Sequence, residues 1–311
     1  MTSTTEPSLL LVHAHPDDET LWTGGTIARY AAAGVRVTLV TCTLGEEGEV
    51  IPDELRGLDS EGADQLGGYR IGELRRACAS LGVTEQRFLG GIGCWRDSGM
   101  VWQEHGKTAT AAPRSHPRSL VAGDPAEQTA QLEAALREVR PQVVVTYASD
   151  GGYGHPDHVR AHELTVAATQ RVPEVRRLFY AVRSVADLRA GLERLGESSD
   201  VPFPLPDAAE LPAVEPDEIT TSVDVAEQLP AKLAALREHR TQVRVWTGDS
   251  SGGVGTAAYA LSNGIGQPVS TTEYYALGSG DEPAPSTDLF AGLNTTSERA
   301  ATSEQAGSHD E

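Results

Sequence analysis

The stretch from residue 9 to residue 19 reads LLLVHAHPDDE, a short apolar run followed directly by histidines and acidic residues. Two more apolar and β-branched runs lie at residues 35–40, VRVTLV, and 143–147, VVVTY. Continuous apolar runs of this length are typical of strands that are buried on both faces of a sheet. The first run therefore predicts a central strand that ends at a cluster of polar side chains.

Helix-period patterns separate these predicted strands, at about residues 20–33, 64–81 and 125–139. The last pattern starts with Asp124 and Pro125, a typical N-cap followed by proline at the first helical position. Strands that alternate with helices indicate βαβ units and a parallel sheet. The first half of the chain therefore predicts an α/β fold.

The second half carries weaker signals. A strand is predicted at about residues 177–182, and helices at about 185–195 and 226–240. Residues 90–123 show little periodicity, and a loop of that length is usually functional. We divide the chain into a catalytic core with the metal site (residues 1–172), a C-terminal portion packed on the core (173–280) and an acidic tail (281–311) that is expected to be disordered.

The charge of the chain limits its partners. Acidic residues outnumber basic ones 45 to 25, which gives a formal net charge of −20. Such a surface repels nucleic-acid phosphates and anionic membranes. No stretch approaches the roughly 18 apolar residues of a membrane span, and the first eight residues do not resemble a signal peptide. We expect a cytoplasmic protein that binds neither nucleic acid nor membrane.

The polar cluster at residues 13–19 combines two imidazoles with three carboxylates. Open α/β sheets bind ligands beyond the carboxyl ends of their strands. Crowded carboxylates repel one another, and a bound cation removes that cost. His15 and Asp18 are donors that Zn²⁺ accepts, and Asp17 beside them is placed to act as general base. The alternative is an acidic helix N-cap, with His13 and His15 as ordinary hydrogen-bonded residues.

A second cluster, GGYGHPDH at residues 151–158, follows another predicted strand. It repeats His-Pro-Asp beside a further potential ligand. Catalytic zinc sites use three protein ligands and leave a fourth position for water. We therefore predict one Zn²⁺ per chain, held by His15, Asp18 and His158, with His162 as a rival for the last position. Fe²⁺ also suits this set of two histidines and one carboxylate.

The two clusters resemble the signatures of the PIG-L/LmbE-like zinc deacetylases. Further segments are similar to one branch of that family, the actinobacterial mycothiol-pathway deacetylases; these segments are residues 41–50, 64–74, 95–100, 260–263 and 273–277. The resemblance implies a Rossmann-like, mostly parallel sheet flanked by helices, with a smaller C-terminal α/β portion. It also implies hydrolysis of the acetamide of N-acetylglucosaminyl-inositol, a small-molecule pseudodisaccharide, in mycothiol biosynthesis.

The resemblance assigns roles to further residues. Tyr153 and His155 would stabilise the oxyanion, and His155 would also protonate the leaving amine. Asp157 is expected to orient His155 and raise its pKa; the alternative is a carboxylate at a helix start. Arg70 and Asp97 match positions that contact the sugar and inositol hydroxyls. Their alternatives are a surface ion pair for Arg70 and a turn residue for Asp97.

Two other functions compete with the deacetylase. An amidase of the same superfamily that cleaves mycothiol S-conjugates would share the zinc, the base and the acid. A non-catalytic zinc- or sugar-binding module would keep the three ligands but would need neither Asp17 nor His155. Release of an amine from N-acetylglucosaminyl-inositol, compared with an S-conjugate, distinguishes the three.

Overall fold

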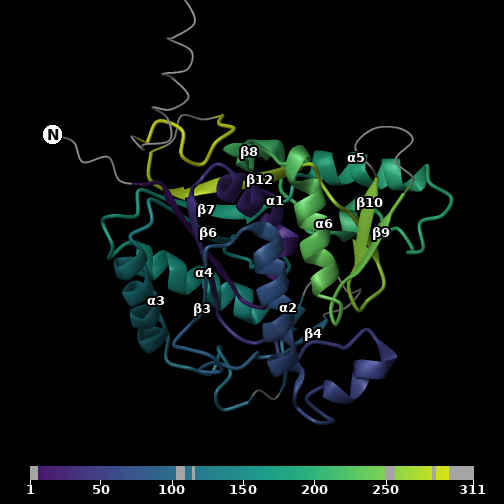
Figure 1. Cartoon of the computed structure of the whole chain (residues 1–311), viewed down its shortest axis with the longest axis horizontal. Helices are drawn as coiled ribbons and strands as arrows, with labels where there is room; N and C mark the ends of the chain where they lie inside the picture. The colour runs from purple at the N-terminus through teal and green to yellow at the C-terminus, as the bar shows by residue number, and fades with distance from the viewer. Residues whose placement is uncertain (1–5, 103–108, 114–115, 249–255, 282–284, 294–311) are drawn as a thin grey trace, which may run out of the picture.

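A seven-stranded sheet with the order β3-β2-β1-β6-β7-β12-β8 forms the centre of the protein (Figure 1). The computed structural model describes residues 6–102, 109–113, 116–248, 256–281 and 285–293. The strands of the sheet are β1 (Ser8–His13), β2 (Arg36–Thr41), β3 (Glu85–Phe88), β6 (Val143–Tyr147), β7 (Arg177–Val182), β8 (Thr221–Asp224) and β12 (Thr272–Ser279).

Strand β1 lies between β2 and β6 and runs parallel to both. Strands β3 and β7 extend the parallel part on either side, whereas β12 is antiparallel to β7 and to β8. Leu9, Leu10 and Leu11 are fully buried, because helices cover both faces of the sheet. The predicted α/β fold with a mostly parallel sheet is therefore confirmed.

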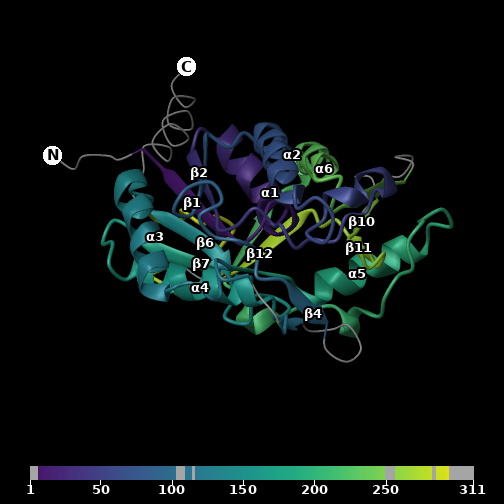
Figure 2. The ribbon, with the colours of Figure 1, turned by 90° about the horizontal axis from the view of Figure 1, so that it is seen from below.

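Helices form one layer on each face of this sheet (Figure 2). On one face lie α1 (Asp18–Ala32), α2 (Leu66–Leu81) and α6 (Leu229–Glu238); on the other lie α3 (Pro125–Val139) and α4 (Pro156–Thr169). Helix α3 begins as predicted, since the Asp124 side chain accepts the amide hydrogen of Ala126. The five helices together bury the apolar strands from both sides.

The order of the strands places a crevice beside β1. The chain leaves β1 towards β2 and β3, and it returns to the opposite side of β1 as β6. The carboxyl ends of β1 and β6 are therefore neighbours at the point where the strand order reverses, which is the usual ligand position in open α/β sheets. The polar clusters that follow His13 and Tyr147 meet at this crevice.

The C-terminal portion contributes strands to the central sheet and also forms a small sheet of its own. Residues 173–280 supply β7, β12 and β8 to the central sheet. They also form α5 (Val185–Gly196) and a smaller sheet of β9 (Arg244–Thr247), β10 (Ala257–Ala260) and β11 (Gly266–Pro268). The central sheet therefore contains strands from both predicted portions, before and after residue 172.

Part of the predicted disordered tail is ordered. Leu289 is fully buried, and the rings of Tyr30 and Phe290 lie 5.3 Å apart in an edge-to-face arrangement. The Tyr30 hydroxyl donates to the Asp288 carboxylate at 2.6 Å. Residues 285–293 of the predicted tail thus contact the core, whereas residues 294–311 lie outside the described part of the chain.

The predicted long loop at residues 90–123 contains a short hairpin of β4 (Met100–Trp102) and β5 (Ala109–Ala111). Four short 3-10 helices lie elsewhere in the described chain, at Asp53–Leu58, Ala208–Glu210, Pro216–Glu218 and Ala226–Gln228. In the part of the chain that the structure describes, no helix has both the length and the apolar content needed to cross a bilayer.

A buried ion pair within the C-terminal portion also contacts helix α1. Glu273 on β12 accepts hydrogen bonds from the amides of Gly25 and Thr26 at 2.8 and 2.7 Å, and from the Lys232 ammonium at 2.7 Å. The Glu273 and Lys232 side chains are 4% and 7% exposed. Such a pair resists removal of one partner, because the other charge is then left buried without compensation.

We expect Glu273→Ala to lower the free energy of unfolding by about 3–5 kcal/mol, because it strands the buried Lys232 ammonium. Urea denaturation of the full chain measures the change. The control is Asp53→Ala, which removes the partner of Arg56 from a pair with 87% and 67% exposed side chains. This control should leave stability nearly unchanged, and an equally small effect of Glu273→Ala would contradict the prediction.

Candidate metal-dependent active site

Tyr147, the last residue of β6, joins the two polar loops. Its ring stacks on the ring of His158, with centroids 4.1 Å apart and an interplanar angle of 15°. Its hydroxyl accepts the amide hydrogen of Ala14 at 2.9 Å. Tyr147 is fully buried, so the loop after β1 and the loop after β6 are held in a fixed relation.

The three predicted ligands converge on one carboxylate oxygen. Oδ2 of Asp18 lies 3.3 Å from Nδ1 of His15 and 3.3 Å from Nε2 of His158. All three residues are buried, with exposed fractions of 6% or less. Donor atoms each about 2 Å from one cation lie roughly 3–3.5 Å apart in a tetrahedral site, so these separations fit a bound metal ion.

The hydrogen bonds of His158 leave one of its ring nitrogens facing the cluster. Its Nδ1 lies 3.0 Å from the Gly151 carbonyl oxygen, which can only accept, so Nδ1 carries the proton. Its Nε2 is buried and has no hydrogen-bond partner among the described residues. In the neutral ring with Nδ1 as the donor, Nε2 faces Asp18 and the cluster, which is the tautomer in which a histidine binds a metal.

His15 is arranged in the complementary way. Its Nε2 lies 3.3 Å from Oδ2 of Asp157, so a proton on Nε2 leaves the lone pair of Nδ1 directed at Asp18. A carboxylate that accepts from the outer nitrogen of a ligating histidine fixes its orientation and raises its basicity. Burial alone would lower the pKa of His15, but Asp97, Asp157 and Asp18 raise it well above its usual value. These carboxylates favour positive charge at the cluster, whether from a proton or from a metal.

Two other combinations of donors, neither of them the predicted set of His15, Asp18 and His158, have ligand atoms that all lie close together. The ligand atoms of His15, His155 and His158 lie within 4.8 Å of one another, and so do those of His15, Asp97 and Asp157. Both combinations include His15, so His155, Asp97 and Asp157 are candidate donors near this residue besides Asp18 and His158. The cluster can hold one divalent cation through nitrogen and oxygen donors.

His162 is not part of this cluster. Its Nδ1 lies 2.9 Å from the Tyr147 carbonyl oxygen, and its ring packs against Tyr180 with centroids 4.9 Å apart. It lies one turn along α4 from His158, and its contacts are with Tyr147 and Tyr180 rather than with the donors of the cluster. The fit to a metal favours His158 over this rival.

Asp17 lies next to the ligands in an unusual conformation. Its φ is 122° and its ψ is −32°, and its Oδ2 is 3.2 Å from Nη2 of Arg70. Burial raises the pKa of Asp17 to about 7, although the neighbouring Arg70 guanidinium opposes this shift. A carboxyl group in such a place is suited to accept a proton near neutral pH.

Arg70 is 2% exposed, so it is not a surface ion pair. Besides Asp17, it donates to the carbonyl oxygens of Gly45, at 2.7 Å, and Pro16. Asp97 is also buried, and its Oδ1 accepts the Gly99 amide hydrogen at 2.9 Å, as in a turn. The same oxygen lies 3.6 Å from Nε2 of His15. Both residues line the cavity described below.

His155 is the N-cap residue of α4, and its Nδ1 accepts the amide hydrogen of Asp157 at 3.1 Å. In the neutral ring the proton then lies on Nε2, which can donate to a bound molecule. The Asp157 carboxylate contacts His15 and the Ser98 amide instead of the His155 ring. Burial and the neighbouring His15 and His158 lower the pKa of His155 well below its usual value. This arrangement differs from the expected one, in which Asp157 raises that pKa.

The Tyr153 ring packs edge-on against His158 and His155, with centroids 5.1 and 6.0 Å away. Burial raises its pKa, so its hydroxyl remains protonated.

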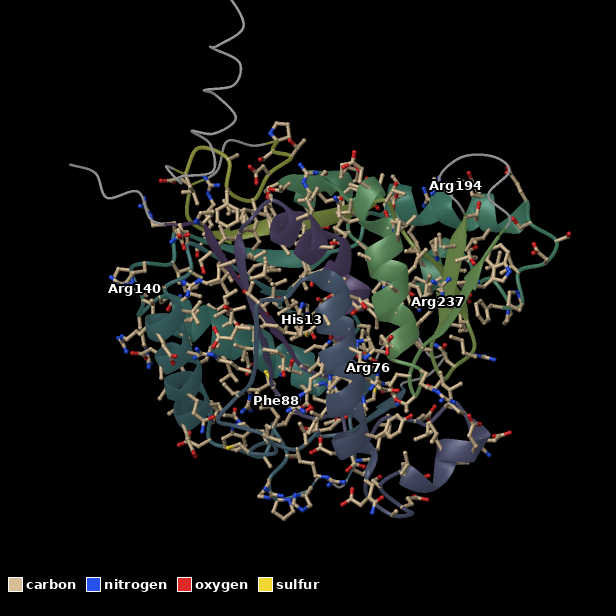
Figure 3. The ribbon with its side chains drawn as sticks, in the orientation of Figure 1. His13, Arg76, Phe88, Arg140, Arg194 and Arg237 are labelled. Atoms are coloured by element: carbon tan, nitrogen blue, oxygen red, sulfur yellow. The ribbon has the colours of Figure 1, made fainter. Side chains whose placement is uncertain are left out.

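His13 lies deeper, near the centre of the molecule, whereas Arg140 and Arg194 lie at the outer edge (Figure 3). Nε2 of His13 is 2.9 Å from the Thr23 hydroxyl oxygen, and burial lowers its pKa to about 4, as suits a core histidine.

A cavity of about 360 Å³ opens above the cluster. Its inner wall includes His15, Asp17, Asp18, Arg70, Asp97, Tyr153 and His155. Its outer wall comes from the loop at residues 47–49 and from the C-terminal portion, including Arg183, Glu210, Gln242, Asn263 and Gln267. Seven of the nine predicted site residues therefore line the cavity. The other two lie beside its inner wall, since Asp157 contacts His15 and His158 contacts Asp18.

Sequence patterns did not indicate several residues that shape the site. The sequence pattern indicates Tyr147 only as the end of a strand, and Ser98 only as part of a loop and of the similar segment at residues 95–100. Glu19 and His239 form a fully buried pair, with Oε1 and Nε2 2.7 Å apart. These partners lie up to 220 residues apart in the chain. The sequence carried no spacing signal that could have joined them.

Comparison with known proteins identifies relatives along nearly the whole chain. The family model described as PIG-L: GlcNAc-PI de-N-acetylase matches residues 10–169. A relative from Saccharopolyspora erythraea, named 1D-myo-inositol 2-acetamido-2-deoxy-alpha-D-glucopyranoside deacetylase 1, is 62% identical over 95% of this chain and 97% of its own. A relative from Actinosynnema mirum, with the same name but no final number, is 60% identical over 94% of this chain and 99% of its own.

A solved structure agrees with the fold. A crystal structure titled as a deacetylase–teicoplanin complex from the biosynthesis pathway of teicoplanin aligns with a TM-score of 0.50. Its sequence identity is 19%, over 88% of this chain and 99% of that one. At that identity the likeness concerns the arrangement of helices and strands alone.

We expect His158→Ala to abolish stoichiometric metal binding, because Nε2 of His158 is the nitrogen left without a hydrogen-bond partner. Elemental analysis of the purified full chain measures metal content per molecule. The matched control is His162→Ala, which removes an imidazole from the same helix but outside the cluster and should leave metal content unchanged. Full occupancy in His158→Ala together with loss in His162→Ala would reverse the assignment.

Proposed function

The chain belongs to the PIG-L family, and from this premise we propose that it is an N-deacetylase. Its substrate would be 1D-myo-inositol 2-acetamido-2-deoxy-α-D-glucopyranoside, from which it would release acetate and the free amine, a step of mycothiol biosynthesis. One observation carries the proposal: a carboxylate shared by two histidines lies beside a second, unshared carboxylate at the base of a cavity. The identity to relatives named for this activity supports the choice of substrate.

We propose Zn²⁺ as the cofactor, held by His15, Asp18 and His158, although Fe²⁺ suits the same donors. When bound, such a cation would polarise the amide carbonyl and lower the pKa of water towards 7. The buried Nε2 of His158 and the carboxylates around His15 support this assignment. The two outer contacts, from Gly151 to His158 and from Asp157 to His15, would keep both imidazoles in the ligating tautomer.

Asp17 would act as general base. Its carboxylate lies beside the metal-binding residues, and the Arg70 guanidinium fixes one of its oxygens. It would take a proton from the attacking water, whose oxygen forms the new bond to the acetamide carbon. The Tyr153 hydroxyl would donate to the developing oxyanion. As the carbon–nitrogen bond breaks, the departing amine needs a proton, which His155 would supply through Nε2 from its doubly protonated form; the developing negative charge of the oxyanion would favour that form against the lowered pKa of the free site.

The cavity would hold the two rings of the substrate. Its volume of about 360 Å³ falls within the range of small-molecule sites. Arg70 and Asp97 lie in its wall beside the cluster and would contact substrate hydroxyls. The Nη atoms of Arg70 contact Asp17, Pro16 and Gly45, so one effect of Arg70 would be on Asp17. Its buried Nε has no hydrogen-bond partner among the described residues.

We expect the purified, zinc-loaded chain to release a primary amine from N-acetylglucosaminyl-inositol with a higher kcat/KM than from a mycothiol S-conjugate. A fluorescent amine-labelling assay compares the two substrates directly. A preference for the S-conjugate would indicate the amidase instead, and binding of both without amine release would indicate a non-catalytic module.

We expect Asp17→Asn to lower kcat by about 10²–10⁴-fold, the usual effect of losing a general base. Metal content should stay at the level of the unmodified chain, because Asp17 is not one of the three donors. Parallel assays of amine release and metal content test this, with Asp53→Asn on the surface as the control. Turnover near that of the unmodified chain, with metal bound, would remove Asp17 from the role of base.

A further inference from the structure

The backbone of Asp17 requires support from its surroundings. Asp17, Asp64 and Arg140 are the three residues other than glycine with positive φ in the described chain. Asp64 and Arg140 have φ near 52°, in the left-handed helical region, whereas Asp17 has a φ of 122° with ψ of −32°. Residues with side chains rarely adopt this second conformation, which persists only where neighbouring contacts fix it.

One side chain binds the amide of Asp17 directly. Oε2 of Glu19 accepts the Asp17 amide hydrogen at 2.9 Å. The carbonyl oxygen of Asp17 accepts from the amides of Thr20 and Leu21 at 3.0 and 2.9 Å, as the start of α1. The peptide group on the N-terminal side of Asp17 is therefore held by the Glu19 carboxylate, and the one on its C-terminal side by the helix.

The second oxygen of Glu19 is bound by His239. Oε1 of Glu19 accepts from Nε2 of His239 at 2.7 Å and from the Thr20 hydroxyl at 2.5 Å. Both Glu19 and His239 are fully buried. With both oxygens bound, the carboxylate is confined to the rotamer that turns Oε2 towards the Asp17 amide.

His239 is itself fixed by the C-terminal portion. It ends helix α6, and its carbonyl oxygen accepts the amides of Gln242 and Val243 at 3.0 and 2.8 Å. Two residues later, Thr241 donates its amide and hydroxyl to Glu73 on α2, at 2.9 and 2.6 Å. The ring of His239 thus reaches the first loop from a rigid turn that is anchored on a second helix.

We propose that Glu19 and His239 form a positioning pair that sets the orientation of Asp17 for proton transfer. The proposal rests on the proposed role of Asp17 as base. Within the described residues, the hydrogen bonds of the Glu19 carboxylate and the His239 ring go to Asp17, to Thr20 and to each other. The pair therefore acts on the base and leaves the three metal donors in place.

The test uses three replacements of His239 in the full, metal-loaded chain. His239→Leu removes the donor and keeps most of the volume. His239→Asn keeps a polar amide that is too short to reach Glu19. His239→Gln places an amide nitrogen near the position of the imidazole Nε2 and can restore the contact.

We expect Leu and Asn at this position to lower kcat by about 10–100-fold, the scale on which a displacement near 1 Å acts. KM should change by less than about twofold and metal content should stay constant, because neither substrate contacts nor ligands are altered. His239→Gln should recover most of kcat. Unchanged kcat in both disabling variants, or parallel loss of metal in all three, overturns the proposal; the Asn variant decides the matter if the Leu variant does not fold.

A second measurement separates this proposal from the proposed function. In a crystal structure of His239→Asn, Asp17 should leave φ near 122° while Asp18 and His158 keep their positions. Absence of amine release by the unmodified chain would contradict the deacetylase function and would leave this structural comparison valid. An Asp17 backbone unchanged in His239→Asn would overturn the positioning pair, whatever the activity.

Discussion

The site depends on the meeting of two loops at the Asp18 carboxylate. Asp18 follows β1 and His158 follows β6. These two strands are adjacent because the chain adds β2 and β3 on one side of β1 and then β6 on the other. Gly151 and Asp157 bind the outer nitrogens of His158 and His15, which leaves one nitrogen of each imidazole facing Asp18. A buried arrangement of like-charged carboxylates is then stable only with a compensating positive charge at its centre.

Around this centre, neighbouring carboxyl groups have different contacts and therefore different pKa values. Asp18 faces two imidazoles, and the nearness of His158 and His15 holds its pKa well below the usual value in spite of its burial. Asp17, one residue earlier, faces Arg70 and is buried without an imidazole contact, so its pKa is raised to about 7. Two adjacent aspartates thereby acquire different proton affinities, the usual basis for different roles in one site.

The sequence predicted those features that depend on local pattern. The apolar runs located β6 and β7 at their observed bounds, and Asp124-Pro125 located the start of α3. Strand β3 was missed, because Glu85, Gln86 and Arg87 lie at an edge of the sheet and lack an apolar run. The paired His-Pro-Asp motifs indicated the donors, but the partner of Asp157 and the Glu19–His239 contact depend on tertiary packing between distant segments.

The placement of β12 between β7 and β8 also affects how the chain is made. Residues 8–169 contain every predicted metal donor and both helices of one face, yet the sheet edge at β7 stays open until residues 272–279 join it. During translation, the nascent amino-terminal half therefore leaves the ribosome with an unpaired strand edge and an unsupported first loop. The Glu19–His239 contact and the outer wall of the cavity are therefore completed only after nearly the whole polypeptide has emerged.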